Sequence, residues 1–187
     1  MSQSKSLSRR DFLRMTSVGV VILYTGIHSK SLLAQGDAPD VEINLNAIPG
    51  EVTILPGTPT SVWRYQGNVI NGDASVLQVL PNSYLGPIFR LRRGQRVRIN
   101  FTNDLPQTTV VHWHGLHLPE EMDAHPRYAI ESGQTYIYDF EVLNRAGTYW
   151  YHAHPDMLTG EQVYRGLAGL FIVSDDEEGA ANLPNGD

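Results

Sequence analysis

The sequence predicts an all-β domain, and three observations lead to that fold class. Most of the chain after residue 40 consists of short runs rich in Val, Ile, Thr, Tyr and Phe. Gly, Pro and Asn separate these runs, as turn residues do between strands. Within several runs apolar and polar residues alternate with a period of two, which is the side-chain period of a β-strand. Regular strands of this length predict a β-sandwich or a Greek-key barrel.

Nine runs have the composition and length of strands. They cover residues 41–45, 51–55, 61–65, 88–92, 95–103, 108–114, 135–142, 147–154 and 167–174. In the fifth run, Val97, Ile99 and Phe101 fall on one face while the positions between them are polar, so this strand has a core face and a solvent face. Only residues 156–166 leave room for a short helix.

One domain, from residue 35 to residue 175, accounts for the strand-forming part of the chain. The chain has 187 residues, and a folded part of about 150 residues can bury roughly 70% of its unfolded surface around one core. Neither a repeat nor an internal linker divides this part. Residues 176–187 are acidic at first, then contain Gly, Ala and Pro without apolar periodicity, which predicts a linker-like tail.

Residues 1–34 are expected to be a signal peptide. The pair Arg9 and Arg10 precedes an apolar run at 15–27 that is shorter than the ~20 residues of a spanning helix, so no stable membrane anchor is expected. The arginines followed by "DFL" resemble a twin-arginine signal, which implies the twin-arginine (Tat) export machinery as a partner and the periplasm as the location. A cut after Ala34 fits this interpretation. The alternative is an amphipathic N-terminal anchor.

The charge and the cysteine count exclude several classes of function. Without residues 1–34 the chain keeps nine basic and 19 acidic residues, so we expect no nucleic-acid partner. The basic cluster from Arg90 to Arg98 alternates with apolar residues, which favours a solvated hairpin face over an anion site. The chain contains no cysteine, so a bound metal must be held by imidazole, carboxylate, thioether or water.

Two HxH pairs contain four of the seven histidines. In an extended strand His112 and His114 project from one face, while Trp113 between them projects from the other. His152 and His154 repeat this geometry. Two such strands side by side, or end to end across a barrel rim, bring four imidazoles together. Imidazole suits copper, zinc, iron and nickel, so the pattern indicates a metal site without selecting the metal.

The simpler interpretation of one HxH pair is two polar residues on a solvent face. Two pairs embedded in aromatic residues favour metal binding instead. The other histidines are assigned no such role, because His28 lies in the expected signal peptide and His117 and His125 lie in an expected surface loop. Met122 and Met157 are isolated, and ordinary packing is expected for both.

The sequence around these histidines resembles the N-terminal cupredoxin domain of multicopper oxidases, the family of laccases, bilirubin oxidases, spore-coat oxidases and periplasmic cuprous oxidases. The similarity includes "VWRYQG" at 62–67, the segment 85–119 with HWHG, and the segment 146–173 with "WYHAH" and "GLAGLFIV". The resemblance implies a cupredoxin-like fold and copper as the cofactor.

The resemblance also implies roles for five residues of this sequence. His112 corresponds to a ligand of the type 2 copper, and His114, His152 and His154 correspond to ligands of the type 3 pair. Asp123 corresponds to an acidic residue that assists proton delivery to the oxygen site. The loop around it departs from the family pattern at two positions, where Gly and Pro are usual; these hold Ala124 and Ser132.

In the family, a type 1 copper held by a cysteine accepts electrons from the substrate, and a three-copper cluster with eight histidines reduces dioxygen to water. This chain holds four such histidines and no cysteine. The resemblance therefore implies the N-terminal part of an exported multicopper oxidase whose C-terminal cupredoxin domain supplies the other ligands. The isolated chain is expected to be inactive. The alternatives are a stand-alone copper-binding or partner-binding module and a subunit completed in trans.

Overall fold

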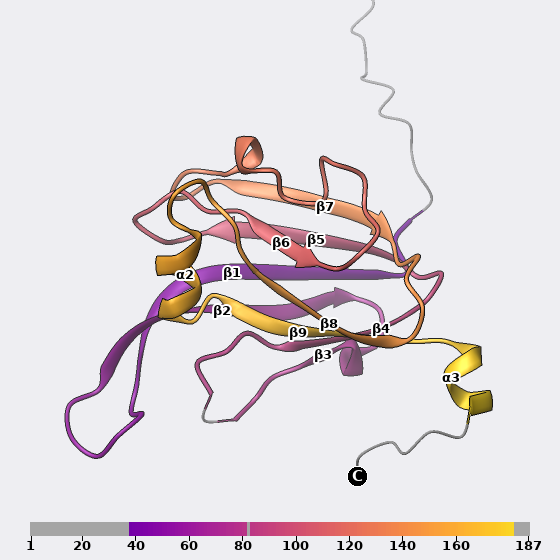
Figure 1. The fold of residues 1–187 in the computed structure, drawn as a ribbon, viewed down its shortest axis with the longest axis horizontal. Coiled ribbons are helices and arrows are strands. Elements are labelled where there is room, and N and C mark those ends of the chain that lie inside the picture. Colours follow the sequence, from indigo (N-terminus) through magenta and orange to yellow (C-terminus); the bar gives the residue numbers. More distant parts are fainter. Residues whose placement is uncertain (1–37, 82, 182–187) are drawn as a thin grey trace, which may run out of the picture. The chain divides into compact units, whose positions relative to one another are not determined.

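The computed structural model describes residues 38–81 and 83–181, which form two β-sheets packed face to face (Figure 1). One sheet has the strand order β2-β1-β5-β7 and the other has the order β3-β4-β9-β8-β6. The predicted all-β sandwich is therefore confirmed. The expected signal peptide lies outside the described residues. Within the described ranges, no helix has the length and apolar character needed to cross a membrane.

The first sheet combines antiparallel and parallel pairing. β1 pairs antiparallel with β2 and parallel with β5, and β5 pairs antiparallel with β7. Its strands are β1 (Val41–Val52), β2 (Thr60–Asn71), β5 (Arg96–Asn103) and β7 (Thr135–Glu141).

The second sheet carries the two histidine pairs. β9 lies at its centre, parallel to β4 and antiparallel to β8, and β8 pairs antiparallel with β6. Its strands are β3 (Leu77–Gln78), β4 (Ile88–Arg92), β6 (Val111–His114), β8 (Gly147–Ala153) and β9 (Ala168–Ser174). The helical segments are the 3-10 turns Ala74–Val76 and Pro126–Tyr128 and the short helices α2 (Thr159–Arg165) and α3 (Asp176–Ala181).

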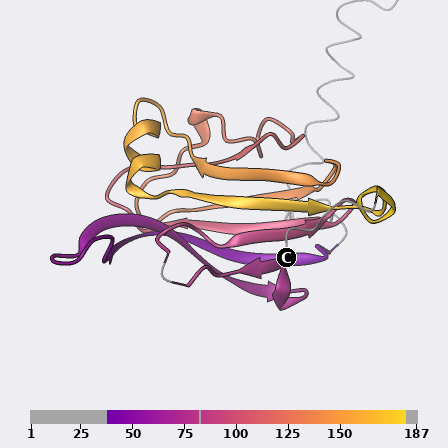
Figure 2. The same ribbon diagram turned by 60° about the horizontal axis from the view of Figure 1, so that its bottom comes forward.

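The two sheets lie one above the other in the turned view (Figure 2), and the side chains of the core fill the space between them. Val97, Ile99 and Phe101 of β5 are fully buried, which confirms the face predicted from their alternation. The second sheet contributes a cluster of fully buried aromatic side chains: Phe89, Trp113, Tyr151 and Phe171. This aromatic cluster lies directly behind the strands that carry the histidines.

The predicted strand at 51–55 is wrong, because β1 is one continuous strand to Val52 and residues 53–59 form the loop to β2. Pro49 and Gly50 look like a break in the sequence, yet both pair with β2. A proline is tolerated there because pairing with β5 on the other edge ends at Ala47, so no partner needs its missing N–H.

The segment from Arg90 to Arg98 is not a hairpin, because β4 and β5 belong to different sheets. Each strand sends its apolar side chains into the shared core, and alternation alone does not reveal which sheet a strand joins. The expected exposure of the basic residues is confirmed for Arg90 and Arg92, whereas Arg96 and Arg98 are partly buried. Arg96 and Arg98 both donate to Asp139, with shortest distances of 2.8 and 2.6 Å.

The expected helix at 156–166 is confirmed as α2, but the start of the expected linker-like tail is also helical. Asp175 precedes α3 and accepts hydrogen bonds from the backbone N–H groups of Glu178 and Ala146, each at 2.8 Å. These bonds lower the pKa of the Asp175 carboxyl, with the bond to Ala146 contributing most. The start of α3 is therefore tied to the residue that precedes β8.

Gly169 of β9 lies opposite Tyr151 of β8, and a Cβ there would come within 2.4 Å of the buried Tyr151 ring. The ring is held in place, because its hydroxyl donates to the Pro87 carbonyl at 2.7 Å. We expect Gly169→Ala to lower the free energy of unfolding by about 3 kcal/mol, measured by urea denaturation. Gly160→Ala in α2 is the control. A Cβ at Gly160 meets no atom within 4 Å, so this variant should raise the free energy of unfolding by no more than about 1 kcal/mol. Equal losses in both variants would contradict the packing argument.

Candidate metal centre

The two HxH pairs lie on neighbouring strands of one sheet. β6 is an edge strand and pairs with β8, so that His112 lies opposite His152 and His114 lies opposite Trp150. The backbone N–H of His154 donates to the Val110 carbonyl at 3.0 Å and continues this pairing beyond β8. All four imidazoles therefore project from the outer face of the sheet, opposite the core.

The four rings form one cluster. Ring centroids lie 5.3 Å apart between His112 and His114, 5.3 Å between His112 and His152, and 5.2 Å between His112 and His154. His152 lies 5.6 Å from His114 and 5.9 Å from His154. The predicted convergence of the four histidines is thus present in the structure.

Backbone carbonyls orient two of these rings. His112 Nδ1–H donates to the Asp123 carbonyl at 2.9 Å, and His152 Nδ1–H donates to the Ala153 carbonyl at 3.0 Å. A carbonyl can only accept, so these bonds place the proton on Nδ1 and leave the Nε2 lone pair of each ring available. Such bonds to the second nitrogen are typical of metal-binding histidines.

The nitrogen positions fit a metal ion. One ligand atom each from His112, His114 and His152 lies within 4.8 Å of the other two. His114 Nδ1 and His152 Nε2 are 3.3 Å apart, close to the separation of two nitrogens that share a metal at about 2.0–2.1 Å with tetrahedral angles. His154 Nδ1 is buried and has no hydrogen-bond partner among the described residues. The donor set is all imidazole, which suits copper.

Asp123 lies against the cluster through two groups. Besides its carbonyl, its carboxylate Oδ1 lies 3.2 Å from His112 Nδ1, and the side chain is 46% exposed. The next residue, Ala124, is buried and has a φ of 61°, in the left-handed region that favours glycine. The backbone at this position therefore suits glycine, the residue that the family pattern has there, and Ala124 adopts the same left-handed region.

Burial lowers the pKa of His152, and the neighbouring imidazoles act in the same direction. Because protonation is disfavoured in the folded state, stability is complete above the ordinary value of 6.5 and is lost as pH falls below it. We expect the free energy of unfolding of the metal-free protein to be lower at pH 5.5 than at pH 7.5. The measurement is chemical denaturation at both pH values. His152→Gln should reduce this difference, and an unchanged difference would assign it to other groups.

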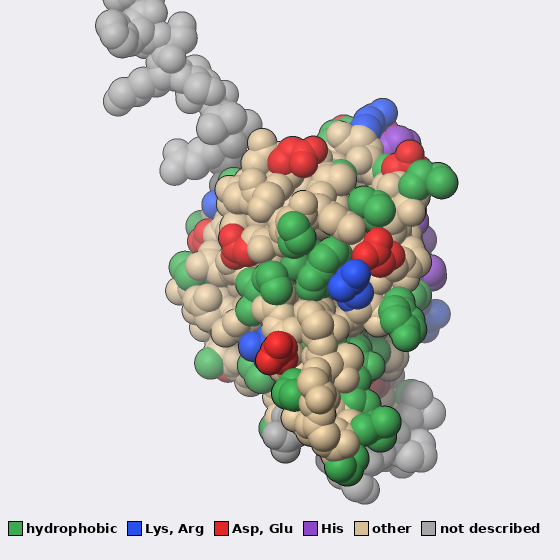
Figure 3. Space-filling model, turned by 90° about the vertical axis from the view of Figure 1, so that its left-hand side faces the viewer, with side chains coloured by type: hydrophobic (Ala, Val, Ile, Leu, Met, Phe, Trp, Pro, Cys, Tyr) green, Lys and Arg blue, Asp and Glu red, His purple; other side chains and the backbone are tan. Residues whose placement is uncertain are grey.

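The remaining expectations concern residues outside the cluster. His117 and His125 are exposed, as predicted, and Met122 packs against the core. Met157 does not pack, because it is 94% exposed. Figure 3 shows the end of the domain where α2 and the β1–β2 loop lie, with apolar side chains at the surface. The exposed apolar residues in and next to these two segments are Met157, Tyr164, Ile54 and Leu55.

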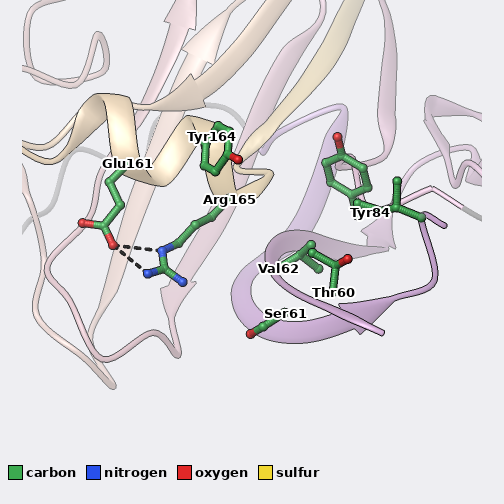
Figure 4. Close-up of a pocket in the computed structure, with 8 residues that line it drawn as sticks. Thr60, Ser61, Val62, Tyr84, Glu161, Tyr164 and Arg165 are labelled. Carbon is green, nitrogen blue, oxygen red and sulfur yellow. Dashed lines mark hydrogen bonds and ion pairs between the residues drawn. The ribbon is translucent and has the colours of Figure 1, made fainter. Parts of the chain in front are cut away.

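A separate pocket of about 370 Å³ lies between β2 and α2 (Figure 4). On one side of it Arg165 pairs with Glu161 at 2.9 Å and stacks on Trp63 at 4.6 Å from the ring centroid. Tyr84 and Val62 contribute to its lining. The pocket shares no lining residue with the histidine cluster, so the two are separate features of the domain.

Comparison with known proteins identifies the family. A family model described as "Multicopper oxidase" matches residues 50–178. The chain belongs to the multicopper oxidase family. It is 34% identical over 134 residues to "Multicopper oxidase mco" of Staphylococcus aureus, covering 72% of this chain and 27% of that protein. It is 33% identical over 187 residues to "Cell division protein FtsP" of Glaesserella parasuis, covering 96% of this chain and 37% of that protein.

The fold is that of a multicopper oxidase domain. The structure of the multicopper oxidase McoA from Aquifex aeolicus aligns with a TM-score of 0.65 and 34% identity, covering 77% of this chain and 29% of that chain. The sandwich is therefore cupredoxin-like, as the resemblance implied, and the family implies copper. This chain spans between 27% and 37% of the length of these relatives.

Sequence reasoning missed one residue beside the histidine cluster. Trp150 lies two positions before His152, on the same face of β8 and opposite His114. The period of two was sufficient to place it on the histidine face. The motif "WYHAH" contained this signal, but only its histidines were assigned a role.

Proposed function

We propose that this chain is the N-terminal copper-binding domain of an exported multicopper oxidase. In this proposal His112 binds the type 2 copper, and His114, His152 and His154 bind the type 3 pair. The observation that supports it best is the register of β6 and β8, which gathers the four imidazoles into one cluster. Copper held by these residues together with the ligands of a second domain would supply the one-electron chemistry by which dioxygen is reduced to water. Export through the twin-arginine route to the periplasm is part of the same proposal.

The surface around the histidines supports a partner domain. His114 is exposed, and on the same outer face Trp150 and its cross-strand neighbour Leu170 are 37% and 40% exposed. The family's three-copper cluster has eight histidine ligands, and this chain holds four of them. We propose that a C-terminal cupredoxin domain covers this face and supplies the other four. The same domain brings the cysteine ligand that this chain lacks.

Copper binding by the purified chain tests the proposal that the histidine cluster binds copper. Anaerobic titration with Cu(I) should show binding that is lost in His152→Ala and kept in His117→Ala, whose side chain lies on the surface. A folded wild-type chain that binds no copper would overturn the proposal. The intact mass of the protein from its own organism tests the second part, because a complete oxidase is several-fold larger than residues 35–187 and has copper-dependent oxygen consumption.

A second function is favoured by the similarity to "Cell division protein FtsP", which extends over 96% of this chain. In this alternative the domain is a copper-binding or partner-binding module without oxidase activity, or a subunit completed in trans. Copper binding without oxygen consumption in the complete native protein supports this alternative. Co-purification of a cysteine-bearing partner distinguishes the trans-completed subunit.

We propose that Asp123 delivers protons to the oxygen site through its half-exposed carboxylate. The Asp123 carbonyl, rather than the carboxylate, fixes the His112 ring, so Asp123→Asn keeps that contact. We therefore expect this variant of the complete oxidase to bind normal copper but to consume oxygen about 100-fold more slowly. Copper content by mass spectrometry and oxygen electrode rates measure the two effects. Loss of copper would make Asp123 a positioning residue instead.

A further inference from the structure

Trp150 lies against two of the proposed copper ligands. Its ring centroid is 4.2 Å from that of His152, with 31° between the ring planes, and 5.0 Å from that of His114, with 34°. The contact with His152 is the closest between aromatic rings in the described part of the chain. β6 and β8 lie side by side (Figure 1), so one indole reaches the imidazoles of both strands.

The indole is one of the rings that cover His152. His152 projects from the outer face of the sheet but is only 6% exposed, whereas Trp150 on the same face is 37% exposed. Trp150 thus lies between His152 and solvent at one side of the cluster.

Ring rotation is the freedom that the backbone leaves open. The χ2 torsion of histidine is broad, so a strand position alone does not determine where the ring nitrogens point. His152 has a carbonyl partner for Nδ1, whereas the hydrogen bond of the His114 ring is with His152 itself. A flat aromatic surface against both rings limits their rotation without taking a nitrogen away from the metal.

We propose that Trp150 is a positioning residue that holds the His114 and His152 rings with Nδ1 and Nε2 facing each other before copper arrives. This inference rests on the proposed function for the identity of the metal. The ring geometry itself does not require copper. Ligands that are already ordered bind a metal more tightly, because less freedom is lost on binding.

The test compares Trp150→Leu and Trp150→Met, which remove the flat ring, with Trp150→Phe, which keeps one. Leu170→Ala is the control, since Leu170 is the cross-strand neighbour of Trp150 with similar exposure. The first readout is the set of imidazole ¹⁵N–¹H NMR signals of the metal-free full chain. The second is the affinity for Cu(I) alone, measured by competition with a chromophoric chelator.

We expect the ring-free variants to broaden the His114 and His152 signals and to weaken Cu(I) binding by roughly ten- to a hundredfold, as loss of a ligand-orienting partner does. Trp150→Phe should keep most of the signal sharpness and most of the Cu(I) affinity. Leu170→Ala should change neither the signals nor the affinity. Unchanged signals and affinity in a folded ring-free variant would overturn the proposal. So would the same change in Leu170→Ala, or failure of both ring-free variants to fold.

A wild-type chain that binds no Cu(I) contradicts the proposed copper function and not the positioning role. The NMR comparison of the metal-free variants still decides the role of Trp150 in that case. The two proposals can therefore fail separately.

Discussion

Trp113→Ala is expected to lower the free energy of unfolding by about 3–5 kcal/mol, the range for removing a large aromatic side chain from a core. Trp113 is fully buried, and its ring lies 5.3 Å from Tyr138, 5.5 Å from Tyr151 and 5.7 Å from Phe89. Domains of this size have a free energy of unfolding of about 5–15 kcal/mol, so this substitution removes a large part of it. Urea denaturation followed by circular dichroism measures it.

Trp113→Phe is the matched control for that prediction. The indole Nε1 of Trp113 has no hydrogen-bond partner among the described residues, so phenylalanine removes volume but no hydrogen bond. We expect it to cost less than about 2 kcal/mol. Because Trp113 anchors the edge strand β6, a small loss in Trp113→Ala would show that β6 is held by other contacts and that the aromatic cluster does not position the first HxH pair.

His114→Ala or His152→Ala is expected to weaken copper binding by more than about 100-fold, because even changes to residues that only orient a ligand cost 10–100-fold. Their nitrogens face each other at 3.3 Å, so each variant removes one half of a shared site. Competition with a Cu(I) chelator measures this loss. His117→Ala, on the surface, should bind as wild type.

In the complete oxidase the same two variants should lose oxygen reduction and keep electron entry at the type 1 copper, because we propose that the type 1 site lies on another domain. An oxygen electrode and the bleaching of the type 1 absorption by substrate report on these two steps. Full oxygen consumption in either variant would refute the assignment of both histidines as ligands.

Most of the fold could be predicted from local alternation. The burial of Val97, Ile99 and Phe101 follows from their period, because one face of each sheet is core and the other is solvent. Prediction failed where residues typical of turns lie within a strand. Pro49 and Gly50 indicate a break, yet β1 continues through them because β2 pairs with this stretch. The choice of partner strand depends on distant residues, so no local pattern reports it.

The four histidines of the candidate site could be predicted from the sequence, but their neighbours could not. Their HxH spacing places each pair on one face of a strand, and their residue type indicates a transition metal. The contact of Asp123 with His112 was reachable only through family resemblance, and its backbone carbonyl was not predicted at all. Backbone groups carry no sequence signal, because every residue has the same carbonyl.

The sequence by itself determined that His112 and His114 share one strand face, that His152 and His154 share another, and that this chain offers no thiolate ligand. Only the tertiary structure decided that His112 lies opposite His152, and that Trp150 lies against two of the rings. The physical reason is that side-chain alternation is a property of each strand alone, whereas pairing and register are determined by the packing of two whole sheets around one core.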